Sequence, residues 1–162
     1  MRFPARFAVS LLVVGFFQVA SVADVGATVP QSVSGNFTTS APVFTGVSPA
    51  GVNLRISAYS IAQFSGAFSG STLFQGTFIL DPLGNIRGHA TEKFTGTVSG
   101  VGAGTVLFQE ETTVSAAGVV HVTATITHGS GGLAHLSGRV IFDGTSAPDL
   151  LSAGTYIGQI QA

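Results

Sequence analysis

The sequence contains no cysteine and no tryptophan, and only 8% of its residues are charged. The lack of cysteine excludes a disulfide-stapled toxin or growth factor, so burial and strand pairing must hold the fold together. After the N-terminal segment the chain carries four basic residues against seven acidic ones, a formal net charge of −3. These basic residues form no stripe, so we expect neither nucleic acid nor an anionic membrane as a partner.

The first residues have the layout of a secretory signal. Two arginines precede the apolar run FAVSLLVVGFFQVA, and small residues follow in SVADVGA. The run is too short and too early for a membrane-spanning helix. Cleavage after Ala23 fits a small-x-small rule, and cleavage after Ala27 fits nearly as well. We therefore expect a signal peptide over 1–23 and one mature domain over 24–162, secreted or periplasmic and not inserted in a membrane.

Glycine is abundant, with 22 residues, and it is spread through alternating Val, Thr and Phe positions. No helical period is visible after the signal, whereas a period of two recurs. Turn sequences such as SPAG, DPLGN and SGVGAG separate the alternating segments. Short antiparallel strands with such breaks predict an all-β sandwich or barrel. The expected strands cover about residues 32–39, 51–64, 72–80, 86–98, 104–115, 119–128, 135–143 and 154–161.

Hairpin register favours a barrel over a flat sandwich. With DPLGN, residues 99–103 and residues 115–119 as loops, every even-numbered apolar side chain lies on one face. Large residues then face glycine, which suits a strongly curved sheet, so we predict an eight-stranded antiparallel β-barrel. The predicted partners are Phe74 with Glu92, Phe78 with Gly88, Glu92 with Glu110, Phe94 with Phe108, Val98 with Gly104, and Glu110 with Ala124.

The chain from Gly66 to Gln161 resembles a known family. Its segments TEKFTGTVSGVGAGTVLFQEET, THGSGGLAHLSGRVIFDG and GTYIGQI are similar to an uncharacterised bacterial family of small barrels, a domain of unknown function. That family is related in fold to plant allene oxide cyclase and more distantly to dirigent proteins. The resemblance implies an eight-stranded barrel with an apolar lumen, which in the named relatives steers a reactive small molecule by shape. The family pattern often has histidine where this chain has Glu110, so the resemblance implies no shared chemistry.

Glu92 and Glu110 are the candidate catalytic residues, because they share the register of the inward-facing apolar side chains. Two buried carboxylates repel each other, so at least one pKa should be raised and the pair should share a proton. Such a pair can act as acid and base, or bind a hydroxyl or cationic group. The alternative is a pair near a wet barrel mouth, or one satisfied by hydroxyl groups and water. The expected ligand-binding residues around the pair are Phe74, Phe94, Phe108 and Ala124.

Histidine spacing predicts no metal site, and we expect no cofactor. His121 and His128 lie an odd number of residues apart on one predicted strand, so they should point to opposite faces. His128 and His135 flank one turn, but the sequence fixes no third ligand beside them.

Three classes of function remain open from the sequence. The first is an exported barrel that binds a small apolar or amphipathic molecule in its lumen, with cyclase or isomerase chemistry through Glu92 or Glu110 if it is an enzyme. The second is a non-catalytic structural or interaction protein with a filled barrel. The third, an outer-membrane barrel, is disfavoured because the outward positions are polar and no aromatic girdle is visible.

Overall fold

Nine antiparallel strands follow one another along the chain in the computed structural model, which describes residues 29–162. The expected signal peptide and both of its cleavage sites lie outside the described residues. Within those residues, no helix is long and apolar enough to cross a membrane. The strands are β1 (Gln31–Thr39), β2 (Val43–Ala50), β3 (Asn53–Gly66), β4 (Phe68–Leu80), β5 (Ile86–Val98), β6 (Gly102–Val114), β7 (Val119–Gly131), β8 (Ser137–Ser146) and β9 (Ser152–Gln161).

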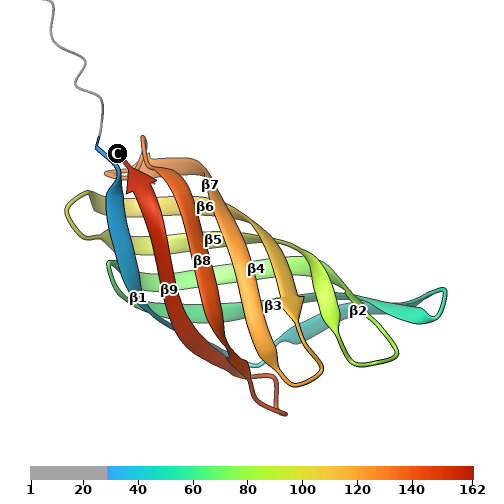
Figure 1. Ribbon diagram of the computed structural model, residues 1–162. Coiled ribbons are helices and arrows are strands. Elements are labelled where there is room, and N and C mark those ends of the chain that lie inside the picture. The colour runs from blue at the N-terminus through green and yellow to red at the C-terminus, as the bar shows by residue number, and fades with distance from the viewer. Residues whose placement is uncertain (1–28) are drawn as a thin grey trace, which may run out of the picture.

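Eight of these strands close a barrel. Each strand from β3 to β9 pairs with the next, and β1 pairs with both β9 and β3 (Figure 1). The expected eight-stranded antiparallel barrel is thus confirmed. β1 pairs with β3 over 62–66, whereas β2 pairs with β3 over 53–59, so the two short strands share one edge of a long one.

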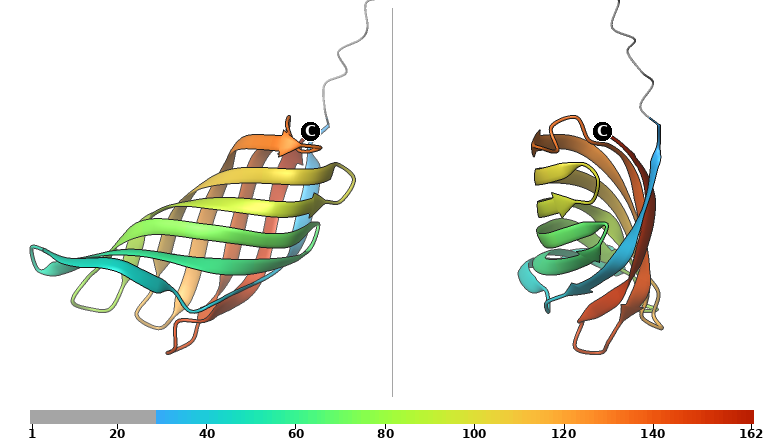
Figure 2. Two further views of the ribbon diagram at one scale, coloured as in Figure 1. Left: turned by 180° about the vertical axis from the view of Figure 1, so that it is seen from behind. Right: turned by 90° about the vertical axis from the view of Figure 1, so that its left-hand side faces the viewer.

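The sequence analysis missed β2. Its side chains are exposed on both faces, so no alternation of apolar and polar residues marks it. Pro49 and a register shift between Phe44 and Gly46 interrupt it further. Such interruptions are typical of edge strands, and within residues 29–162 β2 has β3 as its only strand partner. The hairpin of β2 and β3 projects beyond the other strands at one end of the barrel (Figures 1 and 2).

The two ends of the barrel differ. The projecting hairpin and the β4–β5, β6–β7 and β8–β9 turns lie at one end, which we call the mouth. The first residue of β1 and the last residues of β9 lie at the other, which we call the closed end (Figure 1). There the β7–β8 connection folds inward and buries Leu133 and Leu136.

The predicted registers of the first and third hairpins are confirmed, with Phe74 facing Glu92 and Glu110 facing Ala124. The prediction for the second hairpin is wrong. Its loop is residues 99–101, and the corrected partners are Glu92 with Phe108, Phe94 with Val106, Val98 with Gly102 and Glu110 with Ala90. The error is a shift of two residues, which leaves every side chain on its own face, so the alternation could not reveal it.

An aromatic layer fills the closed half of the barrel. Phe68 and Phe94 meet edge to face with ring centroids 5.3 Å apart, and Phe64 and Tyr156 pack beside them at 5.6 Å from each other. Phe94 and Phe108 are essentially inaccessible to solvent. Such close contacts between rings add to the free energy gained from burial. The closed half is therefore a solid core, which leaves the mouth half to hold any ligand.

Tyr156 ties β9 to the β3–β4 turn across this core. Its hydroxyl accepts a hydrogen bond from the Phe68 N–H at 2.7 Å and lies within donating distance of the Ser65 and Phe68 carbonyls, at 3.1 and 3.2 Å. A Cβ atom on Gly35 would collide with this hydroxyl. Glycine at position 35 therefore makes room for the link that holds the closing strands together.

Replacing Tyr156 with phenylalanine should lower the free energy of unfolding by about 1–3 kcal/mol, because the buried Phe68 N–H would lose its acceptor. Urea unfolding followed by circular dichroism measures this change. Tyr59→Phe is the matched control, since Tyr59 is 39% exposed on the outer face of β3. Equal stability losses in the two variants would contradict a special role for the Tyr156 hydroxyl.

Candidate functional site

The mouth half of the barrel contains a cavity of about 720 Å³. Two of the inward-facing residues that line it, Ala58 and Ser60, have small side chains that leave space inside the barrel. Phe74 and Phe78 stack on one another along its wall with centroids 5.8 Å apart. The aromatic layer forms its floor, and its opening lies among the turns of the mouth, beside β2.

Glu92 and Glu110 lie together at the base of this cavity. Because Glu92 faces Phe108 and Glu110 faces Ala90, the two carboxyl groups are diagonal neighbours on β5 and β6 rather than direct partners. Long side chains at diagonal positions can still meet, and these two form a hydrogen bond with each other. Both residues are only 4% exposed, and both line the cavity.

Burial raises the pKa of both carboxyl groups. For Glu110, burial, the negative charge of Glu92 and their mutual hydrogen bond together raise the pKa well above its usual range. For Glu92, burial raises the pKa, while hydrogen bonding from Glu110 and a contact with the Thr72 hydroxyl lower it again. Glu110 is therefore the proton donor and Glu92 the acceptor. The two groups therefore titrate as one coupled pair, in which the first proton leaves at a lower pH than the second.

The Thr72 contact with Glu92 is weak. It lowers the pKa of Glu92, but the Thr72 hydroxyl makes no hydrogen bond of good geometry. The hydrogen bond from Glu110 is therefore the main interaction that stabilises the charged form of Glu92.

Within residues 29–162, no basic side chain accompanies this charge inside the barrel. The four basic residues and all four histidines are exposed to solvent. The other ionisable side chain pointing inward, Tyr156, lies in the aromatic layer of the closed half. The cavity floor therefore combines two acids with no base.

Thr112 completes the polar floor, and the sequence analysis did not single it out. It follows Glu110 on the same face of β6, is 7% exposed and lines the cavity. Its hydroxyl oxygen makes no hydrogen bond within the described residues. Its even-numbered position two residues after Glu110 was the available signal, since alternation places both side chains in the lumen.

The structure divides the expected ligand-binding residues into two groups. Phe74 lies on the cavity wall beside Glu92. Phe94, Phe108 and Ala124 are buried in the core and do not line the cavity. They pack beneath the glutamates, and the candidate site consists of Glu92, Glu110, Thr112 and Phe74.

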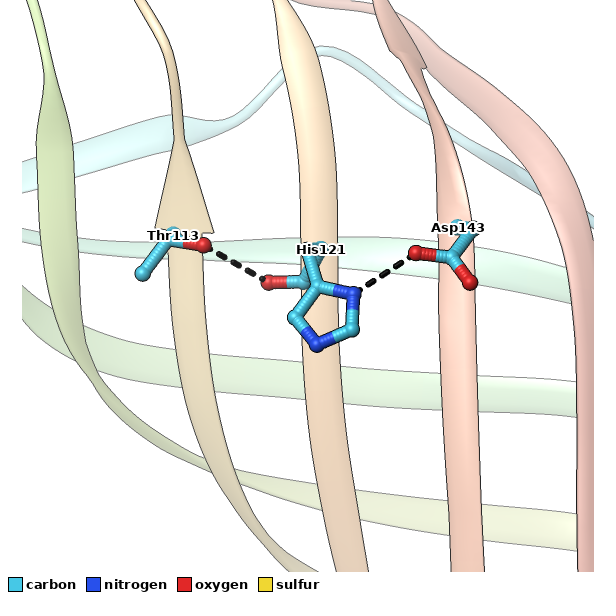
Figure 3. A network of polar contacts seen from close by, with 3 residues as sticks. All are labelled: Thr113, His121 and Asp143. Atoms are coloured by element: carbon cyan, nitrogen blue, oxygen red, sulfur yellow. Dashed lines mark hydrogen bonds and ion pairs between the residues drawn. The ribbon is translucent and has the colours of Figure 1, made fainter.

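A second polar cluster lies on the outer face of the barrel (Figure 3). His121 Nδ1 is 2.6 Å from Asp143 Oδ1, and both side chains are more than half exposed. Thr113 donates its hydroxyl hydrogen to the main-chain carbonyl of His121 at 3.3 Å, not to the imidazole ring. The three residues thus lack the nucleophile-to-base hydrogen bond of a hydrolase triad.

The expectation that His121 and His128 point to opposite faces is wrong. The register shifts in β7 opposite Leu107 and Phe108, and this bulge turns His128 outward as well. A bulge re-aims the side chains that follow it, and nothing in the alternation marks one here. Among residues 29–162, no group of three or more His, Asp or Glu side chains is arranged to hold a metal ion.

Comparison with known proteins gives a match at the level of the fold. No family model and no curated protein sequence matches the chain. One similar solved structure is a protein of unknown function of the DUF3224 family from Shewanella oneidensis, with a TM-score of 0.63 and 16% sequence identity. The alignment covers 81% of this chain and 96% of that one. The small bacterial barrel that the sequence resemblance implied is thus confirmed as a fold, and its link to allene oxide cyclase stays a prediction.

We expect the Glu92–Glu110 pair to titrate in two separate steps, with the upper step above the ordinary range of glutamate, because the pair shares a buried proton. Carbon-13 NMR of the side-chain carboxyl groups across a pH series measures this directly. In Glu110→Gln the upper step should disappear. Two ordinary acidic titrations in the native protein would show that the pair is not special.

Glu110→Gln should stabilise the protein near neutral pH by on the order of 1 kcal/mol, since glutamine keeps a hydrogen-bond donor without an ionisable group. Because the folded pKa is raised, the contribution of Glu110 to stability is full below its unfolded pKa of about 4.5. It is lost as pH rises through the folded pKa. Unfolding midpoints measured at acidic and neutral pH should therefore differ less in the variant than in the native protein.

Glu111→Gln is the matched control for this experiment, because Glu111 is the neighbouring residue on the exposed face of β6. It should leave the unfolding midpoint within about 0.5 kcal/mol of the native value. A gain in stability as large in Glu111→Gln as in Glu110→Gln would show that net charge, not burial, is the cause.

Proposed function

We propose that this protein is an exported barrel that binds one small apolar or amphipathic molecule in the mouth half of its lumen. The observation that carries the proposal is the apolar cavity of about 720 Å³ with a buried carboxyl pair at its base. Pockets for small organic ligands have volumes of roughly 300–1,000 Å³ and combine apolar walls with a few placed polar groups. The export part of the proposal rests on the apolar N-terminal segment and the small residues after it.

The distribution of large and small side chains inside the barrel supports ligand binding. The closed half shows that this chain fills space with phenylalanine where only stability is needed. In the mouth half, Ala58 and Ser60 take inward positions beside Phe74 and Phe78, and the Thr112 hydroxyl has no hydrogen-bond partner among residues 29–162. An unfilled interior and an unsatisfied buried hydroxyl each reduce stability by about 1 kcal/mol or more. An occupant of the cavity would recover both.

The carboxyl pair would also suit proton-transfer chemistry, which is the enzymatic form of this proposal. Glu110 carries a proton that it can donate to a substrate, and Glu92 is placed to accept one. An isomerisation or cyclisation driven by such an exchange consumes no net protons. Apolar walls such as Phe74 and Phe78 would hold the substrate by shape.

The alternative is a structural protein with a filled barrel. The closed half fits that description, because its aromatic side chains are buried and pack against one another. The mouth half does not, since its cavity reaches the barrel interior as far as Glu92 and Glu110. The two functions therefore differ in what they predict for this cavity.

Ala58→Phe tests the lumen directly, because Ala58 is 7% exposed and lines the cavity. The added ring should occupy the space and weaken binding of N-phenyl-1-naphthylamine, a neutral apolar dye, by about tenfold or more. Dye fluorescence measures binding, and native mass spectrometry of the purified protein detects any molecule carried from the cell. Unfolding midpoints verify that each variant is folded.

Ala153→Phe is the control, because Ala153 lies exposed on the outer face of β9. It should bind the dye as the native protein does. If neither protein binds the dye and the native protein carries no small molecule, the structural alternative holds. Equal binding in Ala58→Phe would place the dye outside the lumen.

A further inference from the structure

We propose that the molecule held in the lumen carries a cationic amine, with the Glu92–Glu110 pair as its counter-ion. This inference rests on the proposed function and narrows it to one chemical class of ligand. Three observations carry it, namely the unbalanced charge of the cavity floor, the number of hydrogen-bond acceptors there, and the apolar walls above them.

The charge at the base of the cavity lacks a partner of opposite sign. Glu92 and Glu110 are both buried beneath apolar walls, and the pair becomes negatively charged there once the first of its two protons has left. Buried charges in proteins are normally paired, because an isolated one is costly to remove from water. Every basic side chain and histidine in residues 29–162 is exposed to solvent. The pairing cation must therefore come from outside the described chain.

The polar groups of the floor match the hydrogen bonds of an ammonium group. An alkylammonium ion has three N–H donors. The carboxyl groups of Glu92 and Glu110 and the Thr112 hydroxyl supply three acceptors on two neighbouring strands. Thr112 is only 7% exposed, and its buried hydroxyl makes no hydrogen bond within residues 29–162. It is an independent sign that a polar group of the ligand belongs here.

The apolar walls above the floor favour an apolar body for the part of the ligand that does not contact the carboxyl pair. Phe74 on β4 lines the cavity beside Glu92, and Phe78 on β4 and Ile56 on β3 line it nearer the mouth. An amine with an apolar body would place its ammonium group on the carboxyl pair and its body against these side chains. A fatty acid would instead bring a second negative charge to Glu92, and a fatty alcohol would leave that charge unpaired.

On the protein side, the pH dependence of amine binding should come from the carboxyl pair. The strands packed against it present Ser60 from β3, Thr72 and Phe74 from β4 and Ala124 from β7, none of which titrates. The acid nearest the mouth on the β4–β5 turn, Asp81, is held by hydrogen bonds from Asn85 that lower its pKa. As pH falls, the pair takes up a second proton and loses the charge that attracts the amine. As pH rises, affinity should increase until the amine itself loses its proton near about pH 10.

Decylamine, decanol and decanoate test the inference, because they share one apolar chain and differ in the head group. Isothermal titration calorimetry at about pH 8 should give decylamine an affinity at least about tenfold higher than either of the others. At about pH 4, below the ordinary glutamate pKa of about 4.3, both carboxyl groups are protonated because their pKa values are raised, so this preference should shrink. Titration in buffers of different ionisation enthalpy should show that the pair releases protons to solvent when the amine binds.

Two variants separate the charge from the cavity. The double variant Glu92→Gln, Glu110→Gln should lose the preference for decylamine while it keeps its affinity for decanol. Glu110→Gln alone leaves one carboxylate, so it should keep the preference and lose most of the proton release. Glu111→Gln, on the outer face, should bind all three molecules as the native protein does.

The outcomes distinguish this inference from the proposed function. Equal binding of all three molecules to the native protein, or a preference for amine that survives in the double variant, overturns the amine inference and leaves lumen binding intact. If none of the three binds and N-phenyl-1-naphthylamine does not bind either, both proposals fail.

Discussion

The pairing of β1 with the last residues of β3 is the contact on which the rest of the structure depends. It closes the ring of strands at one end and gives the aromatic layer a continuous wall to pack against. β3 is longer than this contact, and its other half pairs with β2, which has no further strand partner in residues 29–162. The same strand therefore closes one half of the barrel and leaves the other half accessible.

The carboxyl pair shows a conflict between stability and the placement of a charge. A barrel of this size can be filled by side chains alone, and an apolar residue at either position would avoid the desolvation of Glu92 and Glu110. Protonation of one carboxyl group would relieve this conflict in part, because it removes one of the two charges. The remaining charge lies at the boundary between the solid core and the cavity, where a bound cation could reach it.

Much of this arrangement could be predicted from the sequence, and the errors have physical causes. Alternation identified the barrel and placed Glu92 and Glu110 inside it, because burial of one sheet face leaves a period of two in the sequence. It could not detect the two-residue shift in the β5–β6 hairpin, which keeps that period. It also missed β2, whose exposure on both faces removes the signal, and the bulge that turns His128 outward.

Alternation also could not tell which inward residues line the cavity. Phe74, Phe94 and Phe108 all point inward, yet of the three only Phe74 lines the cavity. The boundary between the filled and the hollow half depends on side chains from every strand at the same height along the barrel. Height within a barrel depends on the stagger of the strands. The register of single hairpins does not determine the stagger of the whole barrel. The sequence therefore did not indicate that Thr112 lies at the height of the cavity.

The one-sided opening of the cavity has a consequence for the range of molecules that it can accommodate. A head group on the carboxyl pair has a fixed depth, because the aromatic layer lies directly behind it. The other end of the molecule faces the mouth, where no wall sets a limit. Each further methylene within the cavity would contribute up to about 0.8 kcal/mol, and those beyond the mouth would contribute little. A barrel of this shape would be strict about the chemistry of one end of a bound molecule and tolerant of the length of the other, so it would accept a homologous series of molecules.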